Sequence, residues 1–350
     1  MKDPALKLAF VTHNPHLSRR RKIINSLSKK YKLTLVEPLL KSGKNKLLKA
    51  DFNTAVRLST LGLKSILIQD PVLLDVLACF FFPYKLKRYV VDYPTPLSKE
   101  IKWLGNRVIS QVVSIQEKII NKNAVAVIVP NEPMEYYCHE LGAENICVIP
   151  NYPHLNFRPS ISSNIFKKKC GIPKNSKIAL FTVGDRLKEI YGLDLLLESW
   201  KIIEKILENV LLVFIGPRQD AEMTSWQVSK YAQDFGLKKM KVIGWVDATR
   251  LTNWINTADV CLAPRTPGFP SKWYNDKDST KISEYAALRK PIVAAGYSSS
   301  NQYHVVDRTP EAFAEGILRA FEGKIKPAEP HYWEENEQKL YEVIELLYHQ

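Results

Sequence analysis

The sequence has few cysteines and no clustered metal ligands. Its five cysteines, Cys79, Cys138, Cys147, Cys170 and Cys261, are scattered, and neither a C-x-x-C pair nor a cluster of histidines occurs. Zinc sites need thiolate or imidazole ligands at short spacings, and disulfide frameworks are typical of small secreted chains. The sequence therefore predicts neither kind of site, and a reducing cytoplasm is the simplest setting.

Long apolar runs are also missing. The longest, residues 72–83, contains Asp75 and is about half as long as the roughly 18 residues that cross a bilayer. The apolar run near the N-terminus is too short for a secretory signal peptide. We expect a cytoplasmic chain without a transmembrane segment, either soluble or attached peripherally to the inner face of the membrane.

Positive charge is present in excess, with 50 Lys and Arg against 36 Asp and Glu and a net charge of +14. The excess is concentrated in the first 64 residues, which hold 15 cationic and 3 acidic side chains. Four consecutive cations, Arg19, Arg20, Arg21 and Lys22, follow a loop that contains His13. They form either a solvated helix face or a surface for an anionic acceptor or membrane. No pattern typical of nucleic-acid recognition accompanies them, so we expect no nucleic-acid partner.

Apolar, β-branched segments alternate with helical patterns along the whole chain. The expected strands cover residues 6–11, 65–68, 89–91, 125–129, 146–149, 178–183, 211–216, 241–243, 258–264 and 292–295. Strands that are apolar throughout are buried on both faces, so the pattern predicts an α/β fold with parallel sheets covered by helices. In such sheets, ligands bind beyond the carboxyl ends of the strands, where His13, Asp70 and Asp92 lie.

The length of 350 residues exceeds what one hydrophobic core usually serves, so two domains are expected. A Pro- and Asn-rich stretch, 151–159, reads as the linker between them. The predicted domains are therefore residues 1–152 and residues 153–330.

Residues 276–295 combine a helix start with a following strand. Asp278, Ser279 and Thr280 are each able to cap the helix. The N-terminus of a helix binds anions through unpaired backbone N–H groups, and Lys281 adds a full positive charge in the first turn. This unit suits a phosphate, with Glu284 one turn later placed to accept hydrogen bonds from a ribose. An ordinary capped helix with surface Lys and Glu is the alternative.

The same stretch resembles the nucleotide-sugar signature of the retaining glycosyltransferases with the GT-B fold, known as glycosyl transferases group 1. In that family, two acidic residues eight positions apart lead into a helix and a Pro-Val-Val-Ala strand. Asp276 and Glu284 match the acidic pair, Lys281 fits a common variant, and residues 291–294 match the strand. Asp276 has a shorter reach than the usual Glu, and Arg289 takes a turn position where the family prefers glycine.

Weaker motifs resemble the same family in its order. They are the crossover at 148–159, a Gly-x-Arg-Leu loop at 184–187, Gly-Trp-Val at 244–246 and Ala-Asp-Val-x-Leu-x-Pro at 258–264. The resemblance covers about residues 150 to 310 and is thin before 120. It implies two Rossmann-like domains with parallel sheets that face each other across a cleft. It also implies that a C-terminal helix, within 331–350, packs back on the first domain.

The resemblance implies transfer of a sugar, with retention, from a UDP- or GDP-sugar to a glycan or lipid-linked acceptor, without a cofactor or metal. The residues implied to bind the nucleotide sugar are Gly184, Arg186, Lys188, Gly244, Trp245, Val246, Asp276, Thr280, Lys281, Ile282 and Glu284. Arg186 and Lys281 would stabilise the leaving diphosphate, and Asp92 would support catalysis near the reacting carbon. The acceptor or anionic surface would comprise His13, Arg19, Arg20, Arg21 and Lys22.

Two further features of the sequence keep alternatives open. Tyr191 stands directly before Gly192, where the family commonly has a Lys, so Lys188 or Lys281 would have to replace that cation. Asp276-Lys277-Asp278 is a D-x-D string that binds divalent cations in the other main glycosyltransferase fold, but its place before a helix favours coincidence. The alternatives are a GT-B-like nucleotide-sugar epimerase or hydrolase and a non-catalytic nucleotide-sugar-binding module.

Overall fold

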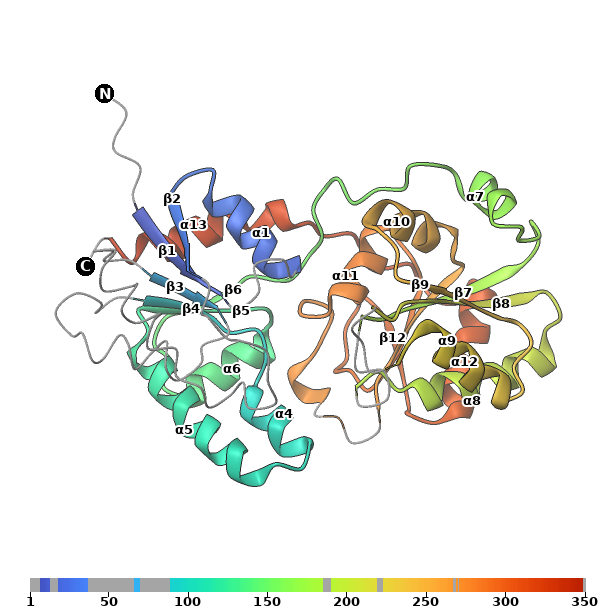
Figure 1. Ribbon diagram of the computed structural model, residues 1–350, viewed down its shortest axis with the longest axis horizontal. Coiled ribbons are helices and arrows are strands. Elements are labelled where there is room, and N and C mark those ends of the chain that lie inside the picture. Colours follow the sequence, from blue (N-terminus) through green and yellow to red (C-terminus); the bar gives the residue numbers. More distant parts are fainter. Residues whose placement is uncertain are drawn as a thin grey trace. The chain divides into compact units, whose positions relative to one another are not determined.

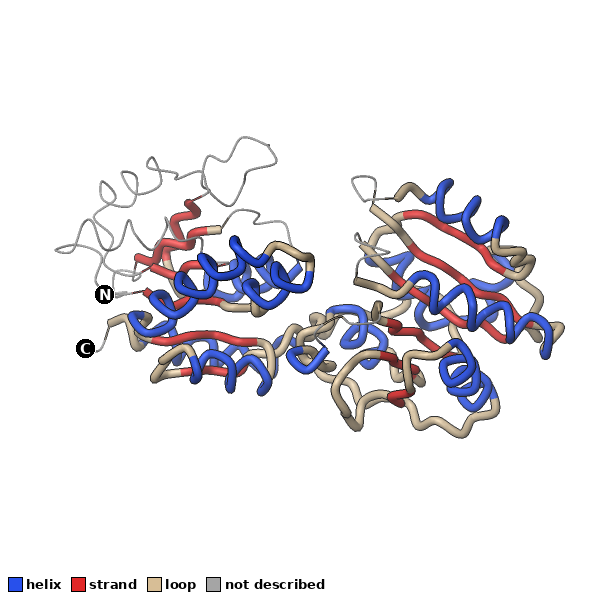
Figure 2. Tube along the Cα trace, turned by 90° about the horizontal axis from the view of Figure 1, so that it is seen from below, coloured by secondary structure: helices blue, strands red, loops and turns tan. Residues whose placement is uncertain are grey.

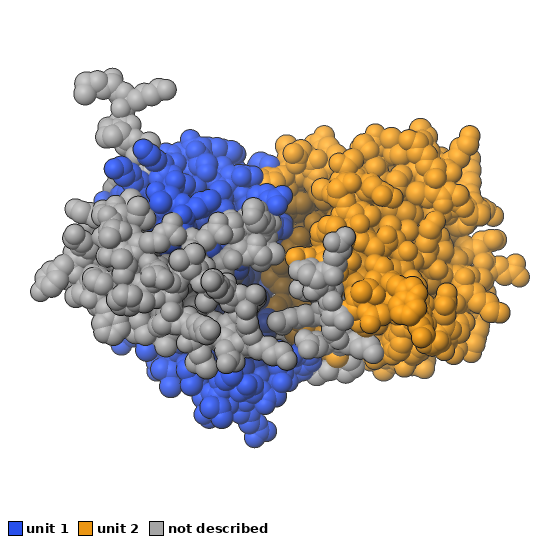
Figure 3. Space-filling view, in the orientation of Figure 1, with its two compact units in different colours: residues 1–151, 333–350 blue, residues 152–332 orange. Residues whose placement is uncertain are grey.

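The computed structural model describes residues 7–12, 18–36, 66–69, 89–184, 190–218, 223–266, 269 and 271–348. The chain divides into two compact units (Figure 3). Unit 1 comprises residues 1–151 and 333–350, and unit 2 comprises residues 152–332. Each unit is an α/β domain built on a six-stranded sheet whose strands all pair in parallel over the described residues (Figure 1).

The sheet of unit 1 has the strand order β2-β1-β3-β4-β5-β6. Its strands are β1 (Lys7–Val11), β2 (Lys32–Val36), β3 (Ile66–Gln69), β4 (Tyr89–Asp92), β5 (Ala126–Val129) and β6 (Ile146–Val148). The described helices are α1 (Ser18–Leu27), α4 (Leu97–Trp103), α5 (Arg107–Asn123), α6 (Glu132–Glu140) and α13 (Glu337–Glu345). The order of the strands reverses between β1 and β3, the kind of switch point at which doubly wound sheets bind ligands.

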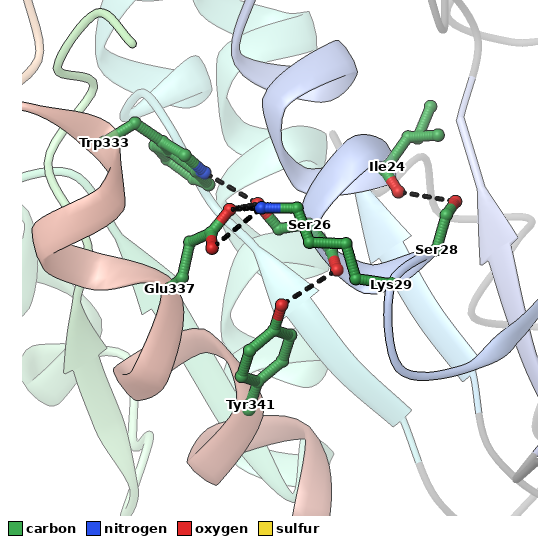
Figure 4. Close-up of polar contacts among 7 residues, drawn as sticks. All are labelled: Ile24, Ser26, Ser28, Lys29, Trp333, Glu337 and Tyr341. Carbon is green, nitrogen blue, oxygen red and sulfur yellow. Dashed lines mark hydrogen bonds and ion pairs between the residues drawn. The ribbon is translucent and has the colours of Figure 1, made fainter. Parts of the chain in front are cut away.

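The C-terminal segment is held in unit 1 by both apolar and polar contacts. Trp333 and the inward residues of α13 share one core with strands β1, β3, β4 and β5. The Trp333 indole N–H donates to Ser26 Oγ over 2.8 Å, and Tyr341 donates to the Ser26 carbonyl over 3.0 Å (Figure 4). Glu337 pairs with Lys29 at 2.6 Å and accepts from Ser26 at 2.7 Å. These contacts fix the chain end to α1.

The sheet of unit 2 has the strand order β12-β11-β10-β7-β8-β9. Its strands are β7 (Lys177–Thr182), β8 (Val210–Ile215), β9 (Met240–Gly244), β10 (Val260–Pro264), β11 (Ile292–Ala295) and β12 (His304–Val306). Its helices are α7 (Ser163–Lys169), α8 (Leu193–Ile206), α9 (Ser225–Asp234), α10 (Ala248–Thr257), α11 (Thr280–Ala287) and α12 (Pro310–Phe321), and they cover both faces of the sheet (Figure 2). The order reverses between β7 and β10, as in the Rossmann fold.

The core of unit 2 follows from the sequence pattern. Strands β7, β8 and β10 are almost wholly buried, and α8 packs a leucine-rich face with Trp200 against them. Gly192 precedes α8 with a left-handed φ of 55°, and a Cβ there would lie 2.9 Å from the carbonyl carbon of Arg265. Glycine is needed because α8 begins directly against the end of β10.

Two features of the chain relate to the sequence-based expectations. Arg289, in the turn after α11, has a φ of 53°, and it is the one non-glycine residue with positive φ among those described. The sequence predicted a position there that favours glycine. Within the described part of the chain, no helix is long and apolar enough to cross a membrane.

Replacing Trp333 by alanine removes a fully buried indole and its hydrogen bond to Ser26. Because a large buried aromatic side chain is lost, we expect W333A to lower the free energy of unfolding of unit 1 by about 3–5 kcal/mol. Urea unfolding followed by circular dichroism measures the effect. The matched control is W226A, since Trp226 in α9 is 69% exposed, and this variant should change stability by no more than about 0.5 kcal/mol. Equal effects of the two variants would contradict the role of Trp333.

Replacing Arg289 by glycine should stabilise unit 2. A left-handed backbone is strained for arginine and unstrained for glycine, so R289G should raise the free energy of unfolding by about 0.5–1 kcal/mol. The control is R319G, because Arg319 is exposed within α12 and glycine inside a helix costs about 1 kcal/mol. Opposite signs for the two arginines in denaturant unfolding would support the assignment, and a loss of stability in both would refute it.

Candidate functional site

Basic and aromatic side chains meet at the carboxyl ends of three central strands of unit 2. Arg265 follows β10, Tyr297 follows β11, and Tyr191 lies between β7 and α8. Lys281 comes from the first turn of α11. This edge of the sheet includes the switch between β7 and β10, where doubly wound sheets bind their ligands.

Arg265 is buried among aromatic rings. Its guanidinium carbon lies 4.6 Å from the ring centroid of Phe269, 4.7 Å from that of Tyr297, 4.9 Å from that of Tyr274 and 5.4 Å from that of Tyr191. Cation–π attraction acts over such distances. The side chain is 5% exposed, and its Nε finds no hydrogen-bond acceptor among the residues that the structure describes.

Lys281 is a second buried cation beside the same ring. Its Nζ lies 3.9 Å from the centroid of Tyr191 and 4.3 Å from that of Phe181, and the residue is 8% exposed. In the described part of the chain, Nζ has no hydrogen-bond partner. Burial, followed by the charge of Arg265, lowers the pKa of the Lys281 ammonium well below its usual value, and Glu284 opposes this shift. We call Arg265, Lys281 and the four tyrosine and phenylalanine rings around Arg265 the cationic cluster.

Two helix N-termini border the cationic cluster. Gly192, at the start of α8, lies against the backbone of Arg265, and its N–H donates to Thr266 Oγ1 over 3.0 Å. Lys281 stands in the first turn of α11. The partial positive charge of both helix ends adds to that of the two side chains. The arrangement suits a ligand that carries at least two negative charges.

A third cation lies close by. Arg308 donates from Nη1 to the carbonyl of Thr266 over 3.1 Å, and burial together with Arg265 lowers the pKa of its guanidinium. Glycine at position 296 leaves room for the Arg308 side chain, since a Cβ there would lie 2.3 Å from Nε of Arg308. Arg308 therefore supports the loop after β10.

The sequence analysis selected five residues around the start of α11, and these residues differ in burial and in contacts. Asp276 is 8% exposed, and one of its carboxylate oxygens accepts from Ser300 over 2.7 Å. Ile282 is fully buried, so only its backbone is available for a ligand. Thr280 and Glu284 are half-buried, and Lys281 belongs to the cationic cluster. Ser279 occupies the N-cap of α11 without a capping hydrogen bond from its side chain, and Lys281 is turned into the protein.

The other predicted nucleotide-sugar residues lie at neighbouring strand ends. Gly184 follows β7, and its carbonyl accepts from the Arg218 N–H over 2.7 Å. Gly244 ends β9 and accepts from the Gly216 N–H over 2.8 Å. Trp245 is 61% exposed, whereas Val246 is buried. Arg186 and Lys188 lie outside the described residues.

Unit 1 holds a buried ion pair where the sequence suggested an exposed cationic face. Arg19 contacts both carboxylate oxygens of Asp92, with Nη2 2.7 Å from Oδ1 and Nε 3.1 Å from Oδ2. Nη1 of Arg19 also donates to the Ile149 carbonyl over 2.8 Å. Asp92 is fully buried, so its observed contact is structural, and a role beside a reacting carbon stays a prediction.

The expectation of a surface formed by the cations of α1 is wrong for three of the four. Arg19, Arg20 and Lys22 are buried, because α1 turns them toward the ends of β4 and β6. Nζ of Lys22 donates to Asn151 Oδ1 over 2.7 Å. Arg21 is exposed, and His13 lies outside the described residues.

Among the described residues, no group of three or more His, Cys, Asp or Glu side chains could hold a metal ion. The two acidic residues of the D-x-D string have other contacts. Asp276 accepts from Ser300, and Asp278 accepts from the backbone N–H of Asn275.

Arg265 is the residue that sequence reasoning missed. The available signal was a cation directly after the apolar strand that ends at Pro264, next to the switch point. Phe269 and Tyr274 follow Arg265 in the same connection between β10 and α11, whereas Tyr191 and Tyr297 come from two other connections, so no local pattern joins all four rings.

The chain is similar to known proteins in part of its sequence and in its fold. The family described as glycosyl transferases group 1 matches residues 177–322. Curated proteins give no match to the sequence. Sucrose-phosphate synthase from Thermosynechococcus elongatus is similar in structure, with a TM-score of 0.69 and 15% identity, covering 97% of this chain and 96% of that one.

Two further solved structures are similar over nearly the whole chain. HepE from Anabaena, in complex with UDP-glucose, has a TM-score of 0.66 and 14% identity, covering 97% of this chain and 99% of that one. A putative UDP-N-acetylglucosamine 2-epimerase from Listeria monocytogenes has a TM-score of 0.66 and 11% identity, covering 98% and 96%. The chain thus has the GT-B fold, and over residues 177–322 it matches the glycosyl transferases of group 1.

Proposed function

We propose that this protein is a glycosyltransferase that takes its sugar from a nucleoside-diphosphate sugar. The observation that carries the proposal is the pair of buried cations, Arg265 and Lys281, in the domain that matches group 1. A buried charge is costly without a counter-charge, and the diphosphate of such a donor supplies one. The likeness to HepE, which is known with UDP-glucose, supports a UDP-sugar, and a GDP-sugar is the alternative donor.

The cluster also accounts for the missing lysine of the family pattern. Tyr191 takes the position before Gly192, and Nζ of Lys281 lies 3.9 Å from its ring. Lys281 would therefore supply a positive charge from α11. Fixed cations and helix N–H groups would stabilise the negative charge that develops on the leaving diphosphate, without reorganising during the reaction. Arg186 and Lys188 stay candidates for the same role.

The remaining parts of the reaction are proposed from the resemblance. Glu284 would bind the ribose, and the loop 244–246 would bind the base, mainly through backbone groups. The acceptor, a glycan or a lipid-linked sugar, would attack from the side of the leaving group, so that the departing phosphate takes its proton. Such a retaining step needs neither a side-chain nucleophile nor a metal.

Nucleotide-sugar epimerisation is the second candidate, because the Listeria structure has this fold. Both activities use a diphosphate site, and they differ in their need for an acceptor. Transfer releases nucleoside diphosphate only when the acceptor is present, whereas an epimerase converts the donor alone. Conversion of the donor's sugar by the protein in the absence of an acceptor would favour the epimerase.

The decisive first experiment is a thermal-shift screen of UDP-, GDP- and dTDP-sugars. A ligand at 100 times its dissociation constant stabilises the native state by about 2.7 kcal/mol, so the correct donor should raise the melting temperature of unit 2. Failure of every nucleotide sugar to do so would remove the proposal.

Replacing Lys281 by methionine should separate ligand binding from stability. A hydrogen bond to a charged group contributes about 1.5–3 kcal/mol, so K281M should weaken UDP binding roughly 10- to 150-fold. It should also raise the stability of the empty protein by at least about 1 kcal/mol, since folding no longer has to desolvate or deprotonate the Lys281 ammonium. Calorimetry and denaturant unfolding measure the two effects.

The matched control is K290M. Lys290 lies just after α11 and donates from Nζ to the carbonyls of Asn256 and Ala258, at 2.6 and 3.0 Å. Its loss should destabilise unit 2 and leave UDP affinity unchanged. If K281M behaves like K290M, Lys281 is structural.

The lowered pKa of Lys281 predicts proton uptake on binding. A diphosphate beside the ammonium raises its pKa again, so between the free and bound pKa values the complex holds one more proton than the empty site. Affinity for UDP should therefore fall as pH rises through this window. Calorimetry at about pH 8, above the phosphate pKa of about 6, in buffers of different ionisation enthalpy measures the uptake. The uptake should vanish in K281M, and its persistence there would assign it to another group.

A further inference from the structure

Helix α5 exposes an apolar face to solvent and turns a mostly polar face toward the interior of unit 1. The residues that it buries are mostly polar, namely Ser110, Val113, Gln116, Glu117, Ile120 and Asn121. Four aliphatic side chains are exposed instead: Val108 at 72%, Val112 at 46%, Ile115 at 64% and Ile119 at 37%. Their spacings of four, three and four residues place them in one stripe along the helix.

A buried polar network fixes this orientation. The Glu117 carboxylate accepts from Tyr93, from Tyr137 over 2.6 Å and from the Ser98 N–H over 2.9 Å. Ser110 Oγ donates to the Ser98 carbonyl over 2.9 Å. Rotation of α5 would bury the aliphatic stripe but leave Glu117 without these donors. A buried carboxylate that loses its hydrogen-bond donors destabilises the fold, so the hydrogen bonds to Glu117 keep the aliphatic stripe on the outside.

Cations flank the stripe at both ends. A hollow of about 450 Å³ between α4 and the start of α5 is lined by Ser98, Lys99, Lys102, Arg107, Ser110, Gln111 and Ser114. At the other end of α5, Lys118 and Lys122 are exposed. Leu104, which is 45% exposed, continues the apolar surface toward α4. Five exposed cations thus surround the aliphatic stripe, and the acidic Glu100 of α4 is only half-exposed.

We propose that this surface, formed by α4 and α5, docks on an anionic phospholipid bilayer. A helix with an aliphatic stripe and flanking lysines lies in the plane of a membrane, with its apolar side chains at the boundary between headgroups and acyl chains. The cations attract the anionic headgroups, and the hollow lined by Lys99, Lys102 and Arg107 accepts lipid phosphates. A second copy of the chain is the weaker occupant, because it would bring the same positive charges face to face.

The proposal is independent of sugar transfer, and the test uses the full-length protein. Co-sedimentation is measured with vesicles of phosphatidylcholine alone and with equal parts of phosphatidylcholine and phosphatidylglycerol. The wild type should bind the anionic vesicles. V112S/I115S should weaken this binding by about tenfold or more, because two exposed aliphatic side chains no longer enter the bilayer. K99Q/K102Q/R107Q should weaken it by about fivefold for each charge at low salt.

The matched control lies on α7 in unit 2, where Ile165 is 52% exposed and Lys168 and Lys169 are exposed. The variant I165S/K168Q/K169Q changes similar side chains and should bind the anionic vesicles as the wild type does. V108S/I119S gives a second test of the stripe, at the two ends of the same helix. The UDP-induced thermal shift of each variant checks that unit 2 keeps its own ligand site.

Three results would overturn the proposal. They are a wild type that does not sediment with anionic vesicles, binding that survives both V112S/I115S and V108S/I119S, and equal binding to vesicles without phosphatidylglycerol. A dimer in light scattering that V112S/I115S dissociates, without any vesicle binding, would assign the surface to a second copy. If the wild type binds anionic vesicles but not UDP, the result would count against the sugar-transfer function and leave the docking proposal unaffected.

Discussion

The placement of two buried cations around the ring of Tyr191 is the constraint on which the site depends. Arg265 and Lys281 come from different elements, and each would be more stable in water than in this interior. The surrounding sheet holds them there. Tyr285 of α11 accepts from the Thr182 N–H over 2.9 Å, which fixes α11 to the end of β7 and so fixes Lys281. Gly192 allows α8 to begin against Arg265. Arg265 and the two helix N-termini therefore provide a positive potential before any ligand arrives, and Lys281 adds to it when it is protonated.

The central strands were predictable because a parallel sheet buries both faces of its strands. Uninterrupted apolar runs such as β5 and β10 therefore mark them clearly. Strands β2 and β12 were missed: both lie at sheet edges and are partly exposed, with polar residues such as Lys32 and His304, whereas the edge strands β6 and β9 were found from their aliphatic residues. The two-domain GT-B fold followed from the order of weak motifs, each of which marks a strand end or a helix start.

The site was predictable in part. Lys281 and the helix start before Glu284 form a local pattern, and the turn at Arg289 is left-handed as its sequence position indicated. Arg265 gave no comparable signal, because its aromatic contacts come from three connections, those after β7, β10 and β11. The cations of α1 misled for the same reason. A run of four positive residues indicates an exposed helix, and only the folded chain shows Asp92 and Asn151 opposite them.

The origin of the counter-charge distinguishes the roles of the positive residues. Where the protein supplies a carboxylate, as Asp92 does for Arg19, the cation is neutralised and its contribution is to folding. Where the nearest groups are aromatic rings and the carboxylates of Asp278 and Glu284 act only through the electrostatic field, as for Arg265 and Lys281, cation–π attraction lowers the cost of burial without cancelling the charge. The remaining attraction is available to a diphosphate. On α4 and α5 the cations stay in water beside aliphatic side chains, and a surface that is both charged and apolar is what a lipid interface matches.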